Sequence, residues 1–309
     1  MKPIYIILMP LFLLTACNPY RSDMKEPELA NSSPKTSSMP VIPATIKNER
    51  DREIYLAQHY WDDVDFNVID NYFSKDEMKQ KFVDYLGLLS VIPEDHVRAN
   101  IPLFLNRIVQ YPVVFRHFIN LFDNFLNDPR SPLKNEEWYI IVLEYVIHSP
   151  KVEELNKIKL QYQLKMLCKN RKGNAATDFA FINPSGEHGN LYTLESPYTL
   201  VIFYDPDCEY CQATINELRN NPLLQGLQRD KRLKVLAVYT ENESKLWLDY
   251  APKMPVQWIN VTDEHQITLH KKYDLRALPS LYLLDGDKKV LLKDTSVEDL
   301  QDYLYDHIK

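Results

Sequence analysis

The sequence has little glycine, little cysteine and no excess of positive charge. Its 309 residues include 6 Gly, 4 Cys, 36 Lys+Arg and 43 Asp+Glu, which gives a formal net charge of −7. So few glycines exclude a collagen-like or low-complexity chain, and four cysteines are too few for a disulfide-stapled scaffold. The acidic balance argues against a protein that binds nucleic-acid phosphates, so we expect no nucleic-acid partner. Repeated apolar runs of about 18 residues, which a polytopic membrane protein needs, are also missing.

The first seventeen residues are typical of an exported protein. Ile4 to Leu14 is an apolar run interrupted only by Pro10. It is too short to span a bilayer as a helix but suits the core of a signal peptide. Leu14-Thr15-Ala16-Cys17 then resembles a bacterial lipobox, which implies cleavage before Cys17 and lipidation of that residue. A plain secretory signal with an incidental cysteine is the alternative.

The N-terminal region is therefore expected to anchor the protein. We predict a signal peptide at residues 1–16 and a lipidated Cys17 followed by a flexible linker up to residue 49, because the Ser-, Pro- and Asn-rich composition cannot bury a core. The protein would face the periplasm from the cell envelope, held to the membrane by acyl chains. In the lipoproteins that this N-terminus resembles, an Asp after the lipidated Cys favours retention in the inner membrane. Asn18 at this position therefore slightly favours the outer membrane.

Residues 50–172 predict an all-helical domain. Phe115, Phe118, Phe122 and Phe125 recur at helical spacing and indicate one apolar helix face. We expect four to six helices packed as hairpins, the last over residues 152–170. Cys168 on that helix is interpreted as a buried free thiol, with a regulatory pairing to Cys208 left open.

Residues 173–309 alternate strand-like and helical patterns. Residues 199–204, 233–239 and 280–285 read as strands, the last turning at Gly286-Asp287 into a partner at 289–293. Helices are expected at 246–250, 262–273 and 297–308. Cys208-Glu209-Tyr210-Cys211 lies between the first strand and a helical run.

A Cys-x-x-Cys at such a junction has a chemical meaning. The first sulfur lies at a helix N-terminus, where free N–H groups and the helix dipole favour its thiolate. The thiolate is the nucleophile in thiol–disulfide exchange. Cys208 would thus attack a substrate disulfide, and Cys211, one turn further, would resolve the mixed disulfide.

Two other uses of this pair remain open. A zinc site would need a second pair of ligands. The candidates are Cys168 and the pair His265 and His270, whose spacing of five does not align them on a helix. No metal is therefore expected. A purely structural disulfide would close too short a loop to stabilise the fold much.

A second motif relates the Cys pair to a known protein family. Arg276-Ala277-Leu278-Pro279-Ser280 precedes a strand about seventy residues after the Cys pair. With Asp178-Phe179 and residues 203–211, this arrangement resembles thioredoxin and, more closely, membrane-tethered TlpA/ResA-like thiol–disulfide oxidoreductases. The whole chain is similar to Bacteroidota-type lipoproteins that carry a helical domain of unknown function before this module. The resemblance implies a thioredoxin-like α/β domain at residues 173–309, with a mixed central sheet flanked by helices.

The resemblance also implies roles for residues near the pair. The Leu278–Pro279 bond would be cis, face the two cysteines and shape a groove for an extended substrate segment. Where thioredoxin has a buried proton-relaying Asp, six residues before the first Cys, this sequence has Ile202. Asp263 and Glu264 are therefore candidate proton relays.

Two further features indicate which redox reaction the protein catalyses. Asp205 and Val201 occupy the positions where a peroxiredoxin has its Thr/Ser and Pro, which argues against direct peroxide reduction. Acidic Glu209 and Asp207 lie beside the Cys208 sulfur and oppose its ionisation, which favours a more reducing couple.

The sequence thus predicts a reductase-leaning enzyme that exchanges disulfides with envelope proteins. Electrons would come from a partner dithiol protein, without metal or organic cofactor. The alternative is an envelope binding or scaffold lipoprotein whose helical domain recognises a partner, the redox pair being secondary.

Overall fold

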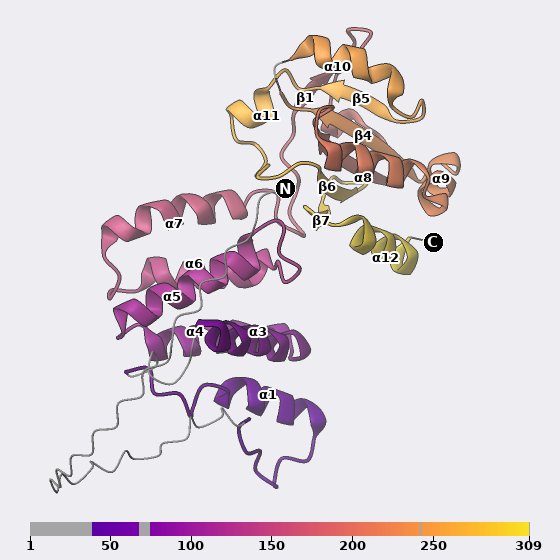
Figure 1. Ribbon diagram of the computed structural model, residues 1–309. Helices are drawn as coiled ribbons and strands as arrows, with labels where there is room; N and C mark the ends of the chain where they lie inside the picture. The colour runs from indigo at the N-terminus through magenta and orange to yellow at the C-terminus, as the bar shows by residue number, and fades with distance from the viewer. Residues whose placement is uncertain (1–38, 68–74, 242, 309) are drawn as a thin grey trace, which may run out of the picture. The chain divides into compact units, whose positions relative to one another are not determined.

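The first half of the described chain consists of helices. The computed structural model describes residues 39–67, 75–241 and 243–308 (Figure 1). Its helices in this half are α1 (Glu49–His59), α3 (Lys75–Val91), α4 (Glu94–Ile108), α5 (Pro112–Phe122), the π-helical turn η1 (Asp123–Asn127), α6 (Glu136–His148) and α7 (Glu154–Leu167). The predicted all-helical region is confirmed. Cys17, the signal peptide and the first part of the linker lie outside the described residues.

The helix starts follow from local chemistry. The Asn48 side chain accepts the Asp51 N–H at 3.2 Å at the start of α1, and the Asn135 side chain accepts the Trp138 N–H at 3.1 Å at the start of α6. Each cap satisfies an N–H group that the helix itself leaves unpaired. Pro112 opens α5, where its missing N–H costs nothing. In the described parts of the chain, no helix is both long and apolar enough to cross a membrane.

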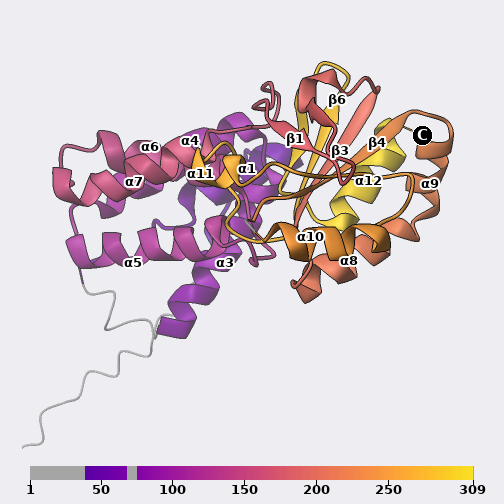
Figure 2. The same cartoon turned by 90° about the horizontal axis from the view of Figure 1, so that it is seen from above.

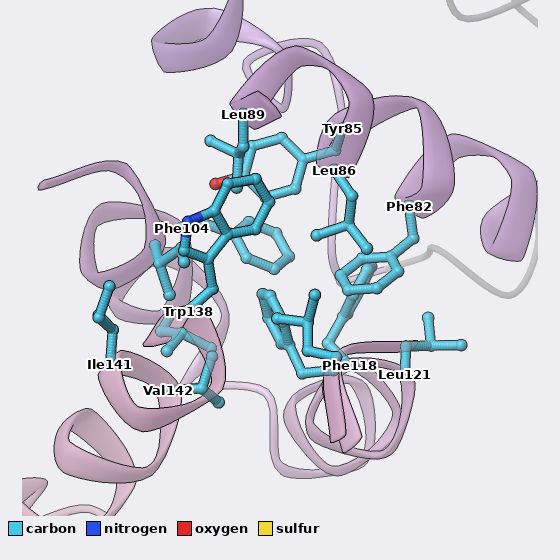
Figure 3. Packing of buried hydrophobic residues seen from close by; sticks show 14 of the residues in the cluster. Phe82, Tyr85, Leu86, Leu89, Phe104, Phe118, Leu121, Trp138, Ile141 and Val142 are labelled. Atoms are coloured by element: carbon cyan, nitrogen blue, oxygen red, sulfur yellow. The ribbon is translucent and has the colours of Figure 1, made fainter. Parts of the chain in front are cut away.

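An aromatic core holds these helices together. Phe82, Phe104 and Phe118 come from three different helices, and their side chains point into one interior (Figure 3). The Phe104 and Phe118 rings meet edge to face with centroids 4.9 Å apart, a favoured aromatic geometry. The predicted stripe on α5 is confirmed, because Phe118 and Phe122 are fully buried. Helix α6 is buried on nearly all sides, as expected for a central helix.

The second half is built on a seven-stranded mixed sheet (Figure 2). Its strands are β1 (Ala180–Ile182), β2 (His188–Asn190), β3 (Tyr198–Tyr204), β4 (Leu233–Tyr239), β5 (Ile259–Thr262), β6 (Ser280–Asp285) and β7 (Val290–Lys293), in the order β2-β1-β5-β4-β3-β6-β7. Strands β3, β4 and β5 run parallel, and β6 is antiparallel to β3. The strands expected from the apolar runs and the turn at Gly286-Asp287 are confirmed.

Alternate residues of β3 face two apolar layers. Its even-numbered residues, Ile202 among them, join a cluster with α8 (Glu209–Arg219), α9 (Pro222–Arg229), α10 (Ser244–Tyr250) and α12 (Val297–His307). Its odd-numbered residues, such as Phe203, pack with Phe179, Tyr273 and the short α11 (Gln266–Leu269). A strand buried on both faces explains the continuous apolar run in the sequence. The predicted α/β fold with flanking helices is confirmed.

Two of the predicted helices are shorter in the structure. The helix expected at 262–273 is reduced to α11, because His265 and Lys271 adopt left-handed backbone conformations with φ of 66° and 48° on either side. The helix expected at 152–170 ends at Leu167, and Asn170 has φ of 48°. Cys168 is consequently the capping residue after α7 and is exposed, so its interpretation as a buried thiol was wrong.

The aromatic core predicts a large cost for truncating Phe118. We expect F118A to lower the free energy of unfolding by about 3–5 kcal/mol, because it removes a fully buried ring and leaves a cavity. Urea denaturation followed by far-UV circular dichroism measures this. V113A on the same helix is the control, since Val113 is 73% exposed, and should change stability by less than about 0.5 kcal/mol. Equal stabilities of the two variants would contradict the assigned core.

Candidate active site

Strand pairing brings together two segments that are seventy residues apart. Phe203 of β3 lies opposite Ser280 of β6 in the antiparallel register. The chain leaving β3 therefore reaches Cys208 on the same side of the sheet from which the chain enters β6 through Leu278 and Pro279. The Leu278–Pro279 peptide bond is cis, as the resemblance implies. The Cys208 thiol donates to the Leu278 carbonyl oxygen at 3.6 Å, so the Cys pair and the cis-proline loop form one site.

Cys208 caps helix α8. Its backbone is extended, with φ of −84° and ψ of 115°, and its sulfur accepts the Cys211 N–H at 3.2 Å. The sulfur thus occupies the place that a Ser or Asp oxygen takes in an ordinary N-cap, facing the positive end of the helix dipole. Cys208 is partly exposed, so a substrate sulfur can approach it. The predicted position at a helix N-terminus is confirmed.

Cys211 has a different environment one turn further. It is fully buried within the same apolar cluster as Ile202, and its sulfur accepts the Asp205 N–H at 3.5 Å. Burial raises the pKa of the Cys211 thiol, and the neighbouring Cys208 adds to the rise. Neither sulfur is in a disulfide in this structure. The pair thus combines an accessible sulfur with a buried one that holds its proton.

The candidate proton relays lie in different settings. Burial raises the pKa of Asp263, whose carboxylate accepts the N–H groups of His265 and Ile267 at the start of α11. Glu264 is exposed. The roles of Asp263 and Glu264 stay predictions. Asp205 joins them as a candidate, because its backbone N–H donates to the Cys211 sulfur and its charge adds to the rise in the thiol pKa that burial causes.

The sequence reasoning missed two neighbours of the site. Tyr250 on α10 packs against the apolar cluster that contains Cys211. Arg276, two residues before Leu278, pairs with Asp274 at 3.0 Å and with Glu136 of α6 at 2.9 Å. Arg276 lay within the recognised motif, but its partner Glu136 is 140 residues away and no local pattern connects them. No group of three or more potential metal ligands gathers among the described residues.

Comparisons with known proteins agree with this geometry. Residues 17–170 match the family model of a domain of unknown function, DUF5106, and residues 190–303 match that of a thioredoxin-like domain. The chain is similar to the crystal structure of a thioredoxin-like protein from Bacteroides caccae, with 35% identity and a TM-score of 0.85 over 88% of this chain and 99% of that one. No curated protein matches the chain.

Shorter solved structures match less than half of the chain. One is the C-terminal domain of an uncharacterised protein from Bacteroides fragilis, with 38% identity over 45% of this chain and 99% of that one and a TM-score of 0.44. Another is a domain of a possible thiol-disulfide isomerase from Cytophaga hutchinsonii, with 27% identity over 45% of this chain and 95% of that one and a TM-score of 0.40.

The chain belongs to the thioredoxin-like proteins and carries a DUF5106 domain before the thioredoxin-like domain.

The buried environment of Cys211 predicts unequal reactivity of the two thiols. At pH 7, iodoacetamide should modify Cys211 in C208S at least about tenfold more slowly than Cys208 in C211S, because a raised pKa leaves less reactive thiolate. The Cys211 rate should still be rising above the ordinary cysteine pKa of about 8.5. Mass spectrometry of timed samples measures both rates. Similar rates at pH 7 would show that Cys211 is not held in its protonated form.

Proposed function

We propose that the chain is a membrane-tethered thiol–disulfide oxidoreductase that acts on disulfide-bonded proteins of the cell envelope through Cys208 and Cys211. The observation that carries this proposal is the pairing of two unlike sulfurs beside the cis-proline loop. The partly exposed sulfur of Cys208 caps α8 at 3.2 Å from the Cys211 N–H, and the buried sulfur of Cys211 lies a turn further. Such an arrangement suits an attacking and a resolving thiol.

The exchange proceeds in two displacements. The Cys208 thiolate attacks one sulfur of a substrate disulfide, so that a Cys208–substrate bond forms and the other substrate sulfur leaves with the electron pair of the broken bond. Cys211 then loses its proton and attacks the Cys208 sulfur. A Cys208–Cys211 disulfide forms and the second substrate thiol is released. Asp205, Asp263 and Glu264 are the candidates for taking the Cys211 proton.

The cis-proline loop provides the substrate groove. The Leu278 carbonyl lies 3.6 Å from the Cys208 sulfur, and Pro279 leads directly into the buried β6. A backbone group at this position can pair with an extended substrate segment as a further strand would. Leu278 and Pro279 thereby orient the substrate disulfide toward Cys208.

A partner must restore the reduced pair. Each turnover leaves a Cys208–Cys211 disulfide, and two electrons from a dithiol protein of the same compartment return it to two thiols. No metal or organic cofactor takes part in these reaction steps. The lipobox at Leu14-Thr15-Ala16-Cys17 supports a lipid anchor at Cys17 that keeps enzyme, donor and substrate at one membrane surface.

Loss of Cys208 should abolish the activity. We expect C208S to reduce insulin, with dithiothreitol as electron source, about a hundredfold or more slowly than the unaltered protein, because no nucleophile remains at the exposed position. C168S is the matched control, since Cys168 is also exposed but lies at the end of α7, and it should retain full activity. Equal insulin reduction by C208S and the unaltered protein would instead favour a binding or scaffold function.

The acidic surroundings of Cys208 predict a reducing couple. Glu209 and Asp207 are exposed next to Cys208, and their charge opposes that of a thiolate there. A less favoured thiolate leaves the disulfide harder to reduce, so we expect a potential well below the DsbA value of about −120 mV. E209Q should shift the potential upward. Equilibration in glutathione buffers measures both values, and a potential near that of DsbA would contradict a reductase.

A further inference from the structure

The cis-proline loop is held on its N-terminal side by residues of the helical region. Arg276 donates to the Asn127 carbonyl oxygen at 2.8 Å and to the side-chain oxygen of the same residue, and it pairs with Glu136 and Asp274. Asn127 ends η1 and Glu136 begins α6, so two points of one connecting segment converge on a single guanidinium. The planar guanidinium fixes the direction of all these contacts.

The other side of the loop is held by the same segment. Ser280, directly after Pro279, donates to the Asp294 carboxylate at 2.8 Å, and Asp294 in turn pairs with Lys134. Lys293 binds the Glu136 oxygen that Arg276 leaves free, at 2.9 Å. Residues on both sides of the cis bond are therefore tied to residues 127–136.

These contacts form a balanced and mostly buried charge network. Its three acidic members and three basic members are Glu136, Asp274, Asp294, Lys134, Arg276 and Lys293. Five of the six side chains are at most 17% exposed, and Arg276 is 27% exposed. Removing one member of a buried network leaves a partner charge uncompensated. The network consequently admits one arrangement of the loop much better than others.

The same segment also carries an exposed basic side chain. Asp128 and Arg130 form a turn directly after η1, and the Arg130 side chain is 88% exposed. Its guanidinium hydrogen-bonds the Asp128 carboxylate at 3.3 Å. Residues 127–136 thus border the site through the cis-proline loop and present a charged side chain to solvent beside the contacts that hold this loop.

We propose that residues 127–136 complete the substrate site of the thioredoxin-like domain, with Arg276 as the positioning residue that holds the cis-proline loop against them. The site then takes extended protein segments, which run past Cys208 along the cis-proline loop and the segment that holds it, in preference to small disulfides. This inference rests on the proposed thiol–disulfide exchange and assigns the DUF5106 domain a part in substrate recognition.

The test compares two substrates for variants of the full chain. We expect R276Q to lower kcat/KM for insulin about tenfold, since a loosened loop misplaces the substrate disulfide, and to lower it for the small neutral disulfide 2,2′-dithiodipyridine less than about twofold. R130A should lower kcat/KM for insulin about threefold without disturbing buried contacts. R229Q is the matched control, because Arg229 pairs with Asp230 on the exposed end of α9, and it should behave as the unaltered protein.

Each result bears on the inference. A selective loss with insulin in R276Q and R130A supports it. Equal losses with both substrates, or no loss in a folded R276Q, overturn it. If thermal unfolding shows that R276Q does not fold, the test rests on R130A. Insulin reduction by R130A equal to that by R229Q then overturns the inference. Failure of the proposed function is distinguishable, because the unaltered protein would then reduce neither substrate.

Discussion

The antiparallel pairing of β3 with β6 is the constraint on which the site depends. Cys208 and Leu278 are separated by 70 residues, and they meet only because Phe203 lies opposite Ser280. Both strands are almost entirely buried, so a shift of one residue would turn apolar side chains onto the wrong face of the sheet. The apolar cores on the two faces therefore fix the register, and the register fixes where the reacting sulfur stands relative to the backbone that would receive a substrate.

Different burial gives Cys208 and Cys211 different environments within this fold. Cys208 stands at the edge of the fold with an N–H directed at its sulfur, whereas Cys211 lies inside the cluster that contains Ile202. The second environment disfavours an ion, because burial raises the pKa of the Cys211 thiol. In the proposed exchange, the partly exposed sulfur of Cys208, which caps α8, meets the substrate first. The buried sulfur of Cys211 acts only after a bond to Cys208 has formed beside it.

The sequence was most informative where the determining contacts are local. The apolar run of β3, the cysteine at the start of α8 and the turn at Gly286-Asp287 each depend on neighbouring residues, and all were predicted. Cys168 was misjudged because helical spacing places it on α7, whereas the helix ends one residue earlier. The partners of Arg276 in the helical region, Asn127 and Glu136, could not be predicted, because contacts between residues 149 and 140 positions apart leave no pattern along the chain.

Apolar packing and charge pairs act at different places in the chain. Residues 39–309 form one compact unit, yet among the described residues the aromatic cluster of the helices shares no member with the two clusters of the sheet. The helical region therefore has its own core. What joins it to the sheet includes directional charge pairs around Arg276 and Asp294. Contacts of that kind add little net stability but define geometry sharply, which is what a substrate groove requires of its walls.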